Sequence, residues 1–400
     1  MQKKLIAVAV AGALAAPAVS MAQSTVQIFG NMYVEYSFWS SGANTANTSN
    51  PANADVLQAP GSEVGFRGEE KLGGGMSAWF QCVSTADPRG VSGDGWCTRN
   101  SAVGLRGGFG SFFIGNWDTP FKRAQHNVGG RDTGAFGTAF LLMGNSTTTD
   151  QGGNAGVFKR RQRNSINYDS PNFGGFQFMA AASSTNNSTN ITTSAAEAKP
   201  RIWSLAAAYR GGPLEVAAGY EKHTKAYNNA VAGAAGTVNT AGVAQTGTTA
   251  VAATFAGDES GWFVSGAYRL GGVRLGALAT EQKADVGIAT TAKVRAYHLG
   301  AEWKIQGPHN LAFGYTIAGD MKGTDGAAMG SRPVVRAAGE TGAKLYQIRY
   351  LHDFSKRTQG TIGYVNLKND RSANYDLGGM TGTGTGAKAS AFVLSIAHRF

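Results

Sequence analysis

The feature of this sequence that most constrains its fold is a regular succession of short segments in which apolar and polar residues alternate. Sixteen such segments follow one another between Thr25 and Phe400, and the connections between them are in turn short and long. Alternation with a period of two is the pattern of a β-strand, because successive side chains point to opposite faces. Strands joined by tight turns run antiparallel, so the short turns gather at one end of the sheet and the long loops at the other. The sequence therefore predicts an all-β protein with one antiparallel sheet of sixteen strands.

The two faces of the predicted strands differ in character. In the last segment one face carries Phe392, Leu394, Ile396, His398 and Phe400, and the other carries Val393, Ser395, Ala397 and Arg399. An apolar face against lipid and a smaller, more polar face against water is the pattern of a transmembrane β-barrel. Pairing the last strand with the first closes the barrel and removes both sheet edges. Aromatic residues near strand ends suit the interfacial girdles of such a barrel: Tyr36, Trp39, Trp117, Tyr209, Trp262, Trp303 and Tyr350.

Composition agrees with this class and excludes a helical membrane protein. After residue 22 no run of about twenty apolar residues occurs, so no helix is expected to span a bilayer. Glycine is abundant at 57 residues, proline is scarce at 10, and charged residues make up only 15%. These proportions are typical of short strands separated by turns and polar loops.

The first 22 residues have the layout of a secretory signal. Lys3 and Lys4 form a positive start, residues 5–16 are apolar, and Ser20-Met21-Ala22 is a small-x-small cleavage site. We therefore expect cleavage between Ala22 and Gln23, with residues 1–22 as signal peptide and residues 23–400 as the barrel; an uncleaved anchor is the alternative. Without the two leader lysines, 34 Lys and Arg remain against 25 Asp and Glu, a formal net charge of +9. Such a balance indicates anionic partners, and export argues against nucleic acid.

The chain has two cysteines, Cys82 and Cys97. An exported chain matures in an oxidising compartment, so a disulfide that closes this glycine-containing loop is expected. Two unrelated thiols are the alternative.

One loop is much longer than its neighbours. A short strand at Ser111–Trp117 is followed by a segment rich in Gly, Thr, Asn and Ala that runs from Asp118 to Val157. A strand with four cations at its start, Lys159–Asp169, comes next. A loop of this length without periodicity of its own is usually functional or disordered. If it folds into the barrel, it narrows the bore, and the basic strand charges the bore.

Several short stretches, in order along the whole mature chain, resemble the general-diffusion porins of Gram-negative bacteria, in particular the trimeric sixteen-stranded porins of β-proteobacteria. They are Val26–Gly30, Gly65–Gly73, Phe109–Gly115, Asn164–Phe173, Ser355–Thr358 and His398–Phe400. The resemblance implies an outer-membrane channel for small hydrophilic solutes and inorganic ions, with short periplasmic turns, external loops and a third loop inside the lumen. It also implies a homotrimer in contact with outer-membrane lipid and lipopolysaccharide, with Phe400 as the signal read by the assembly machinery. Neither a cofactor nor a metal is implied.

Two positions depart from the pattern of the family. Many relatives carry a basic residue at the position of Glu63 and an arginine at the position of Asn116. Both differences lower the positive charge near the expected constriction. We therefore expect only a weak preference for anions.

Pores select ions by charged side chains at their narrowest point. Strand alternation places Arg67 on the polar face of its strand, together with Glu63, and places Arg161, Arg163 and Arg349 on the inner faces of theirs. The third loop offers Asp118 and Asp132 across from them. The sequence thus predicts a wall of cations facing a loop of carboxylates; the alternative for each cation is a position at the rim.

Other functions remain as alternatives. A substrate-specific channel on the same barrel needs a ligand track, and the aromatic residues near the third loop show no regular spacing: Phe112, Phe113, Trp117, Phe121, Phe136 and Phe140. A surface-exposed adhesin or receptor is a second alternative. No nucleophile elbow, phosphate loop or zinc motif is present, so we expect no enzyme. His126 in the third loop is a candidate pH sensor, although a solvated loop residue is the simpler expectation.

Overall fold

The computed structural model describes residues 26–42, 53–90, 95–131, 134–143, 158–183, 201–229, 255–287, 290–325, 336–337, 339–378 and 383–400. The strands of the first half are β1 (Gln27–Ser41), β2 (Asn53–Gln58), β3 (Glu63–Gly73), β4 (Met76–Thr85), β5 (Ser101–Gly107), β6 (Gly110–Asp118), β7 (Arg161–Asp169), β8 (Phe176–Ser183) and β9 (Arg201–Gly211). Those of the second half are β10 (Leu214–Asn229), β11 (Phe255–Leu270), β12 (Val273–Gly287), β13 (Thr290–Gln306), β14 (His309–Ala318), β15 (Lys322–Gly323), β16 (Ala343–Asp353), β17 (Thr358–Asn369) and β18 (Lys388–Arg399). Three short helical segments, α2 (Pro120–Ala124), η1 (Ala135–Gly137) and α3 (Thr138–Leu142), lie between β6 and β7.

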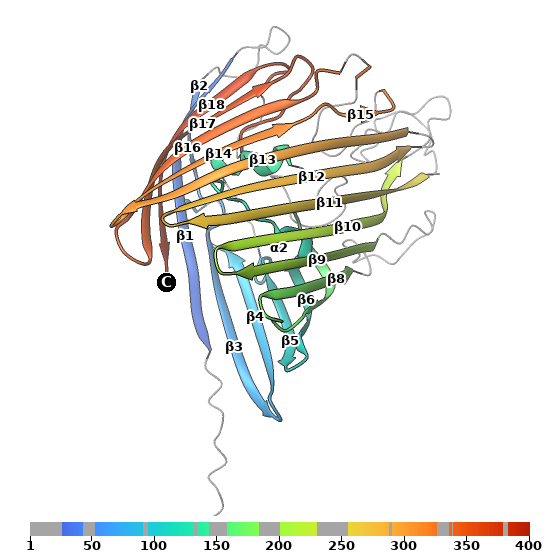
Figure 1. Cartoon of the computed structure of the whole chain (residues 1–400), viewed down its shortest axis with the longest axis vertical. Coiled ribbons are helices and arrows are strands. Elements are labelled where there is room, and N and C mark those ends of the chain that lie inside the picture. The colour runs from blue at the N-terminus through green and yellow to red at the C-terminus, as the bar shows by residue number, and fades with distance from the viewer. Residues whose placement is uncertain are drawn as a thin grey trace, which may run out of the picture.

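The strands form one closed antiparallel sheet (Figure 1). β1 pairs with β18 on one side, and on the other side with β3 and then β2, which follow one another along it. β14 and β15 likewise share the position beside β13. The 18 strand segments of the sheet therefore occupy sixteen positions, and the predicted sixteen-stranded antiparallel barrel is confirmed.

The polar segment before Pro60, expected to be a loop, contains a strand. Residues Asn53–Gln58 pair with Glu35–Ser40 of β1 and extend the barrel wall beyond the end of β3. Ala54 and Val56 pack against the buried apolar cluster inside the barrel, while Leu57 is exposed on the outer face. The Asn- and Ala-rich composition hid this alternation in the sequence.

The third loop contains the short helices, which its sequence period did not predict. α2 begins at Pro120, and the side chain of the preceding Thr119 accepts from the N–H of Lys122. A capping Thr followed by Pro is a common start of a helix. Among the described residues, no helix is long and apolar enough to cross a membrane.

The outer and inner faces of the barrel follow the predicted alternation along most strands. On β6, Phe112 and Ile114 are exposed on the outer face, whereas Phe113 between them is only 2% exposed. Two of the expected girdle residues lie elsewhere. Trp39 is buried in the apolar cluster inside the barrel, and Trp117 packs against Trp79 and Phe113 on the inner face.

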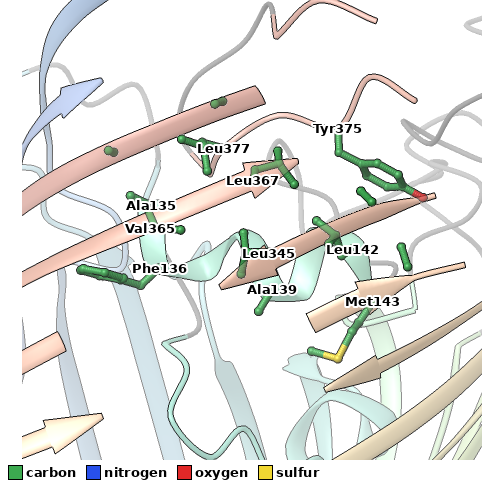
Figure 2. Close-up of a cluster of buried hydrophobic side chains, with 14 of the residues drawn as sticks. Ala135, Phe136, Ala139, Leu142, Met143, Leu345, Val365, Leu367, Tyr375 and Leu377 are labelled. Carbon is green, nitrogen blue, oxygen red and sulfur yellow. The ribbon is translucent and has the colours of Figure 1, made fainter. Parts of the chain in front are cut away.

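Part of the barrel interior is filled with apolar side chains. Phe136, Ala139 and Leu142 of η1 and α3 pack against the inner faces of β16 and β17, where Leu345 and Val365 are fully buried (Figure 2). Burying a side chain of the size of Leu or Phe stabilises a fold by roughly 1.5–3 kcal/mol. This packing fixes the described part of the third loop against this side of the wall.

Candidate functional site

The third loop, called here the inward loop (residues 119–157), runs along the inner wall. Residues 119–131 and 134–143 of it are described. Near its start, the N–H of Phe121 donates to Ser204 Oγ on β9 at 3.0 Å, and the N–H of His126 donates to Ser265 Oγ on β11 at 3.2 Å. His298 Nε2 on β13 then donates to the carbonyl of Val128 at 2.9 Å. The loop therefore crosses the interior, as its length and the family resemblance led us to expect.

The tightest contact between the inward loop and the wall requires glycine on both sides. A Cβ atom on Gly129 would lie 1.8 Å from the carbonyl oxygen of Phe313, and one on Gly300 would lie 1.7 Å from that of Val128. Gly129 also has a φ of 75°, a conformation that favours glycine. Only residues without side chains allow the two backbones to approach this closely.

The next part of the loop is held by three polar side chains of the wall. Glu302 Oε1 accepts from the N–H of Gly129 at 3.0 Å, and Gln347 Nε2 donates to the carbonyl of Gly129 at 3.2 Å. Arg349 Nη2 donates to the carbonyl of Gly130 at 2.8 Å. These bonds satisfy backbone groups of a loop that lies away from bulk water.

Glu35 on β1 anchors the start of η1 and was not singled out from the sequence. Its Oε1 accepts from the N–H of Ala135 at 2.8 Å, and its carboxylate also accepts from Tyr33 Oη and Gln58 Nε2, each at 2.5 Å. The guanidinium of Arg131 lies 3.5 Å from the centre of the Tyr33 ring. The only available signal was a carboxylate on the inner face of the first strand, between Tyr33 and Ser37.

The described part of the inward loop is cationic, and the carboxylates that pair with it lie on strands of the wall. The described part of the inward loop carries Lys122, Arg123, His126 and Arg131 and no carboxylate. The wall supplies the carboxylates: Asp118 lies 3.1 Å from Lys122 Nζ, and Asp169 holds Arg123 through two bonds of 2.7 Å. Asp132 lies outside the described residues. The described part of the loop is thus cationic and pairs with carboxylates of the wall. Asp118, expected at the start of the loop, is the last residue of β6. The facing of loop carboxylates and wall cations stays a prediction.

Arg349 points inward, but the loop covers it. Its residue surface is 5% exposed, and its guanidinium lies 5.3 Å from the centre of the Phe136 ring, besides its bond to Gly130. It therefore holds the loop rather than facing water at a constriction. Strand alternation gave its face correctly, but the covering loop is a long-range contact that alternation does not reveal.

Three of the other expected charges lie in ion pairs of the β3–β7 wall. Glu63 accepts from Arg99 Nε at 2.6 Å. Arg161 is buried, with Nε 3.2 Å from Asp118 and 2.8 Å from the side-chain oxygen of Asn100. The structure thus brings Arg161 and Asp118 together and gives Glu63 a separate partner.

A bulge interrupts the basic strand between Arg163 and Ser165. Asn164 has a φ of 52°, and the pairing of β6 with β7 jumps from Trp117 opposite Gln162 to Gly115 opposite Ser165. Strict alternation, which placed Arg163 on the same face as Ser165, does not hold across this bulge. Arg163 is half-buried beside it.

Arg67 lines an open cavity of about 880 Å³ on the inner face of the wall from β3 to β8. Its Nε donates to Gln27 Oε1 at 3.0 Å, and its guanidinium lies 4.9 Å from the centre of the Phe29 ring. Its exposure makes Arg67 the predicted cation best placed to meet a solute.

The remaining predicted features lie at the edges of the barrel. Cys82 and Cys97 form a disulfide with a Cα–Cα distance of 4.7 Å. Phe400 exchanges backbone hydrogen bonds with Gly30 at 3.1 and 3.2 Å, so the last residue lies at the seam of the barrel. Ala22 and Gln23 lie outside the described residues.

His126 is buried rather than solvated, because the loop presses it against the wall. Its residue surface is 5% exposed, and Nδ1 lies 3.4 Å from Glu215 Oε2. Burial lowers the pKa of His126 below its ordinary value of 6.5, with Arg210 and Arg274 acting in the same direction and Glu215 against it. The neutral imidazole is therefore favoured.

Comparison with known proteins agrees with this geometry. The family model described as Gram-negative porin matches residues 7–372. The major outer membrane protein P.IB of Neisseria gonorrhoeae is 37% identical over 117 residues, which cover 29% of this chain and 30% of that protein. The outer membrane porin protein 32 of Delftia acidovorans is 26% identical over 414 residues and is matched over the full length of both chains.

A solved structure, the anion-selective porin from Comamonas acidovorans, shares the fold. It superposes with a TM-score of 0.68 at 21% sequence identity and covers 94% of this chain and 100% of that one. The match with the first of the Neisseria relatives spans less than a third of that protein's length. With a closed sixteen-stranded barrel, an inward third loop and a family match over most of its length, the chain belongs to the Gram-negative porins and is an integral β-barrel protein of the outer membrane.

Proposed function

We propose that this protein is a water-filled channel for passive diffusion of small hydrophilic solutes and inorganic ions, without enzymatic activity. The observation that carries the proposal is the inward loop, which fills one side of the lumen and leaves the β3–β8 wall open to a cavity of about 880 Å³. A loop that narrows a barrel without closing it sets a size limit, and charged groups around the opening set the ion preference.

The channel is weakly anion-selective. The loop contributes Lys122, Arg123 and Arg131, and exposed Arg67 adds a cation at the open wall. Lys122 and Arg123, however, are paired with Asp118 and Asp169, so the net field across the opening is small. A solved porin of the same fold is described as anion-selective, which agrees with the sign of this preference.

The channel works as a homotrimer in contact with outer-membrane lipid and lipopolysaccharide. The resemblance to trimeric porins supports this assembly, as does an apolar groove of about 630 Å³ on the outer wall, lined by residues of β1, β2 and β16–β18 such as Tyr36, Leu57 and Ile396. The signal peptide is removed after Ala22 during export, and the assembly machinery recognises the last strand with its terminal Phe400.

Reconstitution in planar bilayers tests these proposals. Stepwise openings in groups of three, with a reversal potential in a salt gradient that indicates a modest anion preference, would support a trimeric diffusion channel. A folded, heat-modifiable barrel that never conducts would contradict the channel proposal and favour an adhesin or receptor. A strong cation preference would overturn only the assigned selectivity.

A further inference from the structure

Three aromatic rings lie together on the inner face of the open wall. The ring centres of Trp79 on β4 and Phe113 on β6 are 5.2 Å apart, and the centre of Trp117 lies 5.7 Å from that of Trp79 and 5.1 Å from that of Phe113. All three line the cavity of about 880 Å³ that also contains Arg67. Trp79 and Phe113 are only 8% and 2% exposed, whereas Trp117 is half-buried and presents part of its ring to the cavity. We refer to these three residues as the ring cluster.

The ring cluster depends on a glycine in the intervening strand. Gly104 on β5 is paired with Trp79 on one side and with Phe113 on the other. A Cβ atom on Gly104 would lie 2.5 Å from Cβ of Phe113 and 2.9 Å from Cε2 of Trp79. The two rings meet across β5 because this position has no side chain, so the backbone itself makes room for a packed aromatic cluster.

Cationic groups border the ring cluster. The guanidinium of Arg106 lies 5.1 Å from the centre of the Trp79 ring, and Nη1 lies 3.4 Å from Glu69 Oε2. In the register of β3 and β4, Arg67 lies opposite Gln81, which is two residues from Trp79 on the same face of β4. The side chain of Arg67 donates one hydrogen bond, from Nε to Gln27 Oε1. Within the described part of the chain, its two Nη groups have no hydrogen-bond or ion-pair partner. The cavity therefore combines the half-buried ring of Trp117, packed against two buried rings, with a guanidinium whose paired N–H groups are unoccupied.

The carboxylates of this cavity do not cancel that charge. Asp169 is held by two bonds from Arg123, and Glu69 accepts from Ser77 Oγ at 2.5 Å in addition to its contact with Arg106. The positive charge of Arg67 is therefore not paired with a carboxylate of this cavity. A carboxylate can bind a guanidinium through two parallel hydrogen bonds.

We propose that the ring cluster and Arg67 form a binding subsite for aromatic carboxylates that pass through the channel. The solute ring packs against Trp117 in the edge or offset geometry that aromatic pairs prefer, and its carboxylate accepts from the Nη groups of Arg67. This inference rests on the proposed channel function and deepens it, because it names a class of solute that the lumen retains. It also answers the requirement for a ligand track: residues scattered in the sequence, Trp79, Phe113 and Trp117, converge on one face.

Three small probes separate the two halves of the subsite. Benzoate offers both a ring and a carboxylate, acetate only the carboxylate, and phenol only the ring. We expect benzoate to bind the detergent-purified protein about tenfold or more tightly than either acetate or phenol, measured by titration calorimetry. In planar bilayers we expect benzoate, at concentrations where acetate has no such effect, to reduce the chloride current of each open channel.

Variants assign the effect to the named residues. Trp117→Leu and Arg67→Gln should each weaken benzoate binding several-fold, while Trp117→Phe retains most of it. Trp262→Leu on the outer face of β11 is the matched control and should bind benzoate as the wild type does. Block is expressed as a fraction of each variant's own chloride current.

The outcomes distinguish the subsite from the channel. Conducting channels that treat benzoate and acetate alike would overturn the subsite and leave the channel proposal standing. The absence of any conductance from the folded protein would overturn the channel, while calorimetry would still decide the subsite. Benzoate binding that both Trp117→Leu and Arg67→Gln leave unchanged would also overturn it, and if those variants fail to fold, the comparison of the three probes on the wild type still decides.

Discussion

Glu35 Oε1 on β1 lies 2.8 Å from the backbone nitrogen of Ala135 in the inward loop. This bond joins the first strand of the barrel to a residue 100 positions further along the chain. The same carboxylate accepts from Tyr33 and Gln58, so it has a polar partner on each side. This side chain therefore supplies a polar anchor for the start of η1, beside the apolar packing of Phe136.

Replacing Glu35 with alanine should loosen the start of η1. Hydrogen bonds to a charged group contribute about 1.5–3 kcal/mol each, and removal of the acceptor leaves the N–H of Ala135 without its partner. We expect a lower thermal unfolding midpoint and larger current fluctuations in the open channel. Glu70→Ala, at an exposed carboxylate near the turn after β3, is the matched control. Equal fluctuations in both variants would show that Glu35 does not hold the loop.

Arg67 and Arg349 were expected to act alike, and the structure separates them. Arg67 is exposed at the open wall, whereas Arg349 lies beneath the loop with its guanidinium on the carbonyl of Gly130. Arg67→Ala should therefore shift the reversal potential toward cations with little change in stability. Arg349→Ala should instead destabilise the barrel by about 1–3 kcal/mol, because a buried carbonyl loses its donor. Reversal potentials and thermal melts of both variants test the distinction, and a larger selectivity change in Arg349→Ala would contradict it.

The sequence was sufficient to predict the barrel, because the period of two in each strand and the alternation of short turns with long loops are local features. It also gave the inner face of Arg349. It did not give the strand at Asn53–Gln58, whose polar composition resembles a loop, or the bulge at Asn164, which depends on pairing with β6.

The site itself was harder to predict because its contacts are distant in sequence. The ring cluster joins residues of β4 and β6 across a glycine, and Glu35 meets the inward loop a quarter of the chain away. The wall carboxylates Asp118 and Asp169 decide which loop cations are neutralised, because they meet Lys122 and Arg123 only in the folded protein.

Stability should fall in mild acid through His126. Burial holds the pKa of His126 below its ordinary value of 6.5, so the folded state keeps the ring neutral while the unfolded chain takes up a proton. The unfolded state then binds more protons, and the free energy of unfolding decreases as the pH falls below about 6.5. Above about pH 6.5 the ring is neutral in both states, so His126 does not lower the free energy of unfolding there. Thermal midpoints of wild type and His126→Gln, measured between about pH 8 and pH 5, isolate this residue. Identical pH slopes for the two proteins would contradict the prediction.

The disulfide between Cys82 and Cys97 should stabilise the barrel without affecting the pore. It closes a loop with a sequence separation of 15 residues, for which restriction of the unfolded chain is worth about 3 kcal/mol. We expect the Cys82→Ser, Cys97→Ser double variant to melt at a lower temperature and to keep the conductance of the wild type. Wild type treated with reductant should match the variant, and an altered single-channel conductance would show that this loop reaches the lumen.

Gly300→Ala tests the closest approach between the loop and the wall. A Cβ atom there would lie 1.7 Å from the carbonyl oxygen of Val128, so the loop must move away from β13 and lose the bond from His298 as well. Overpacking of this kind costs about 1–3 kcal/mol, and a displaced loop changes the width of the bore. Gly266→Ala on β11 is the matched control, because the nearest atoms to its new Cβ are 3.5 Å away. We expect a lower melting point and a shifted single-channel conductance for Gly300→Ala alone, and equal behaviour of the two variants would mean that the loop does not rest on β13.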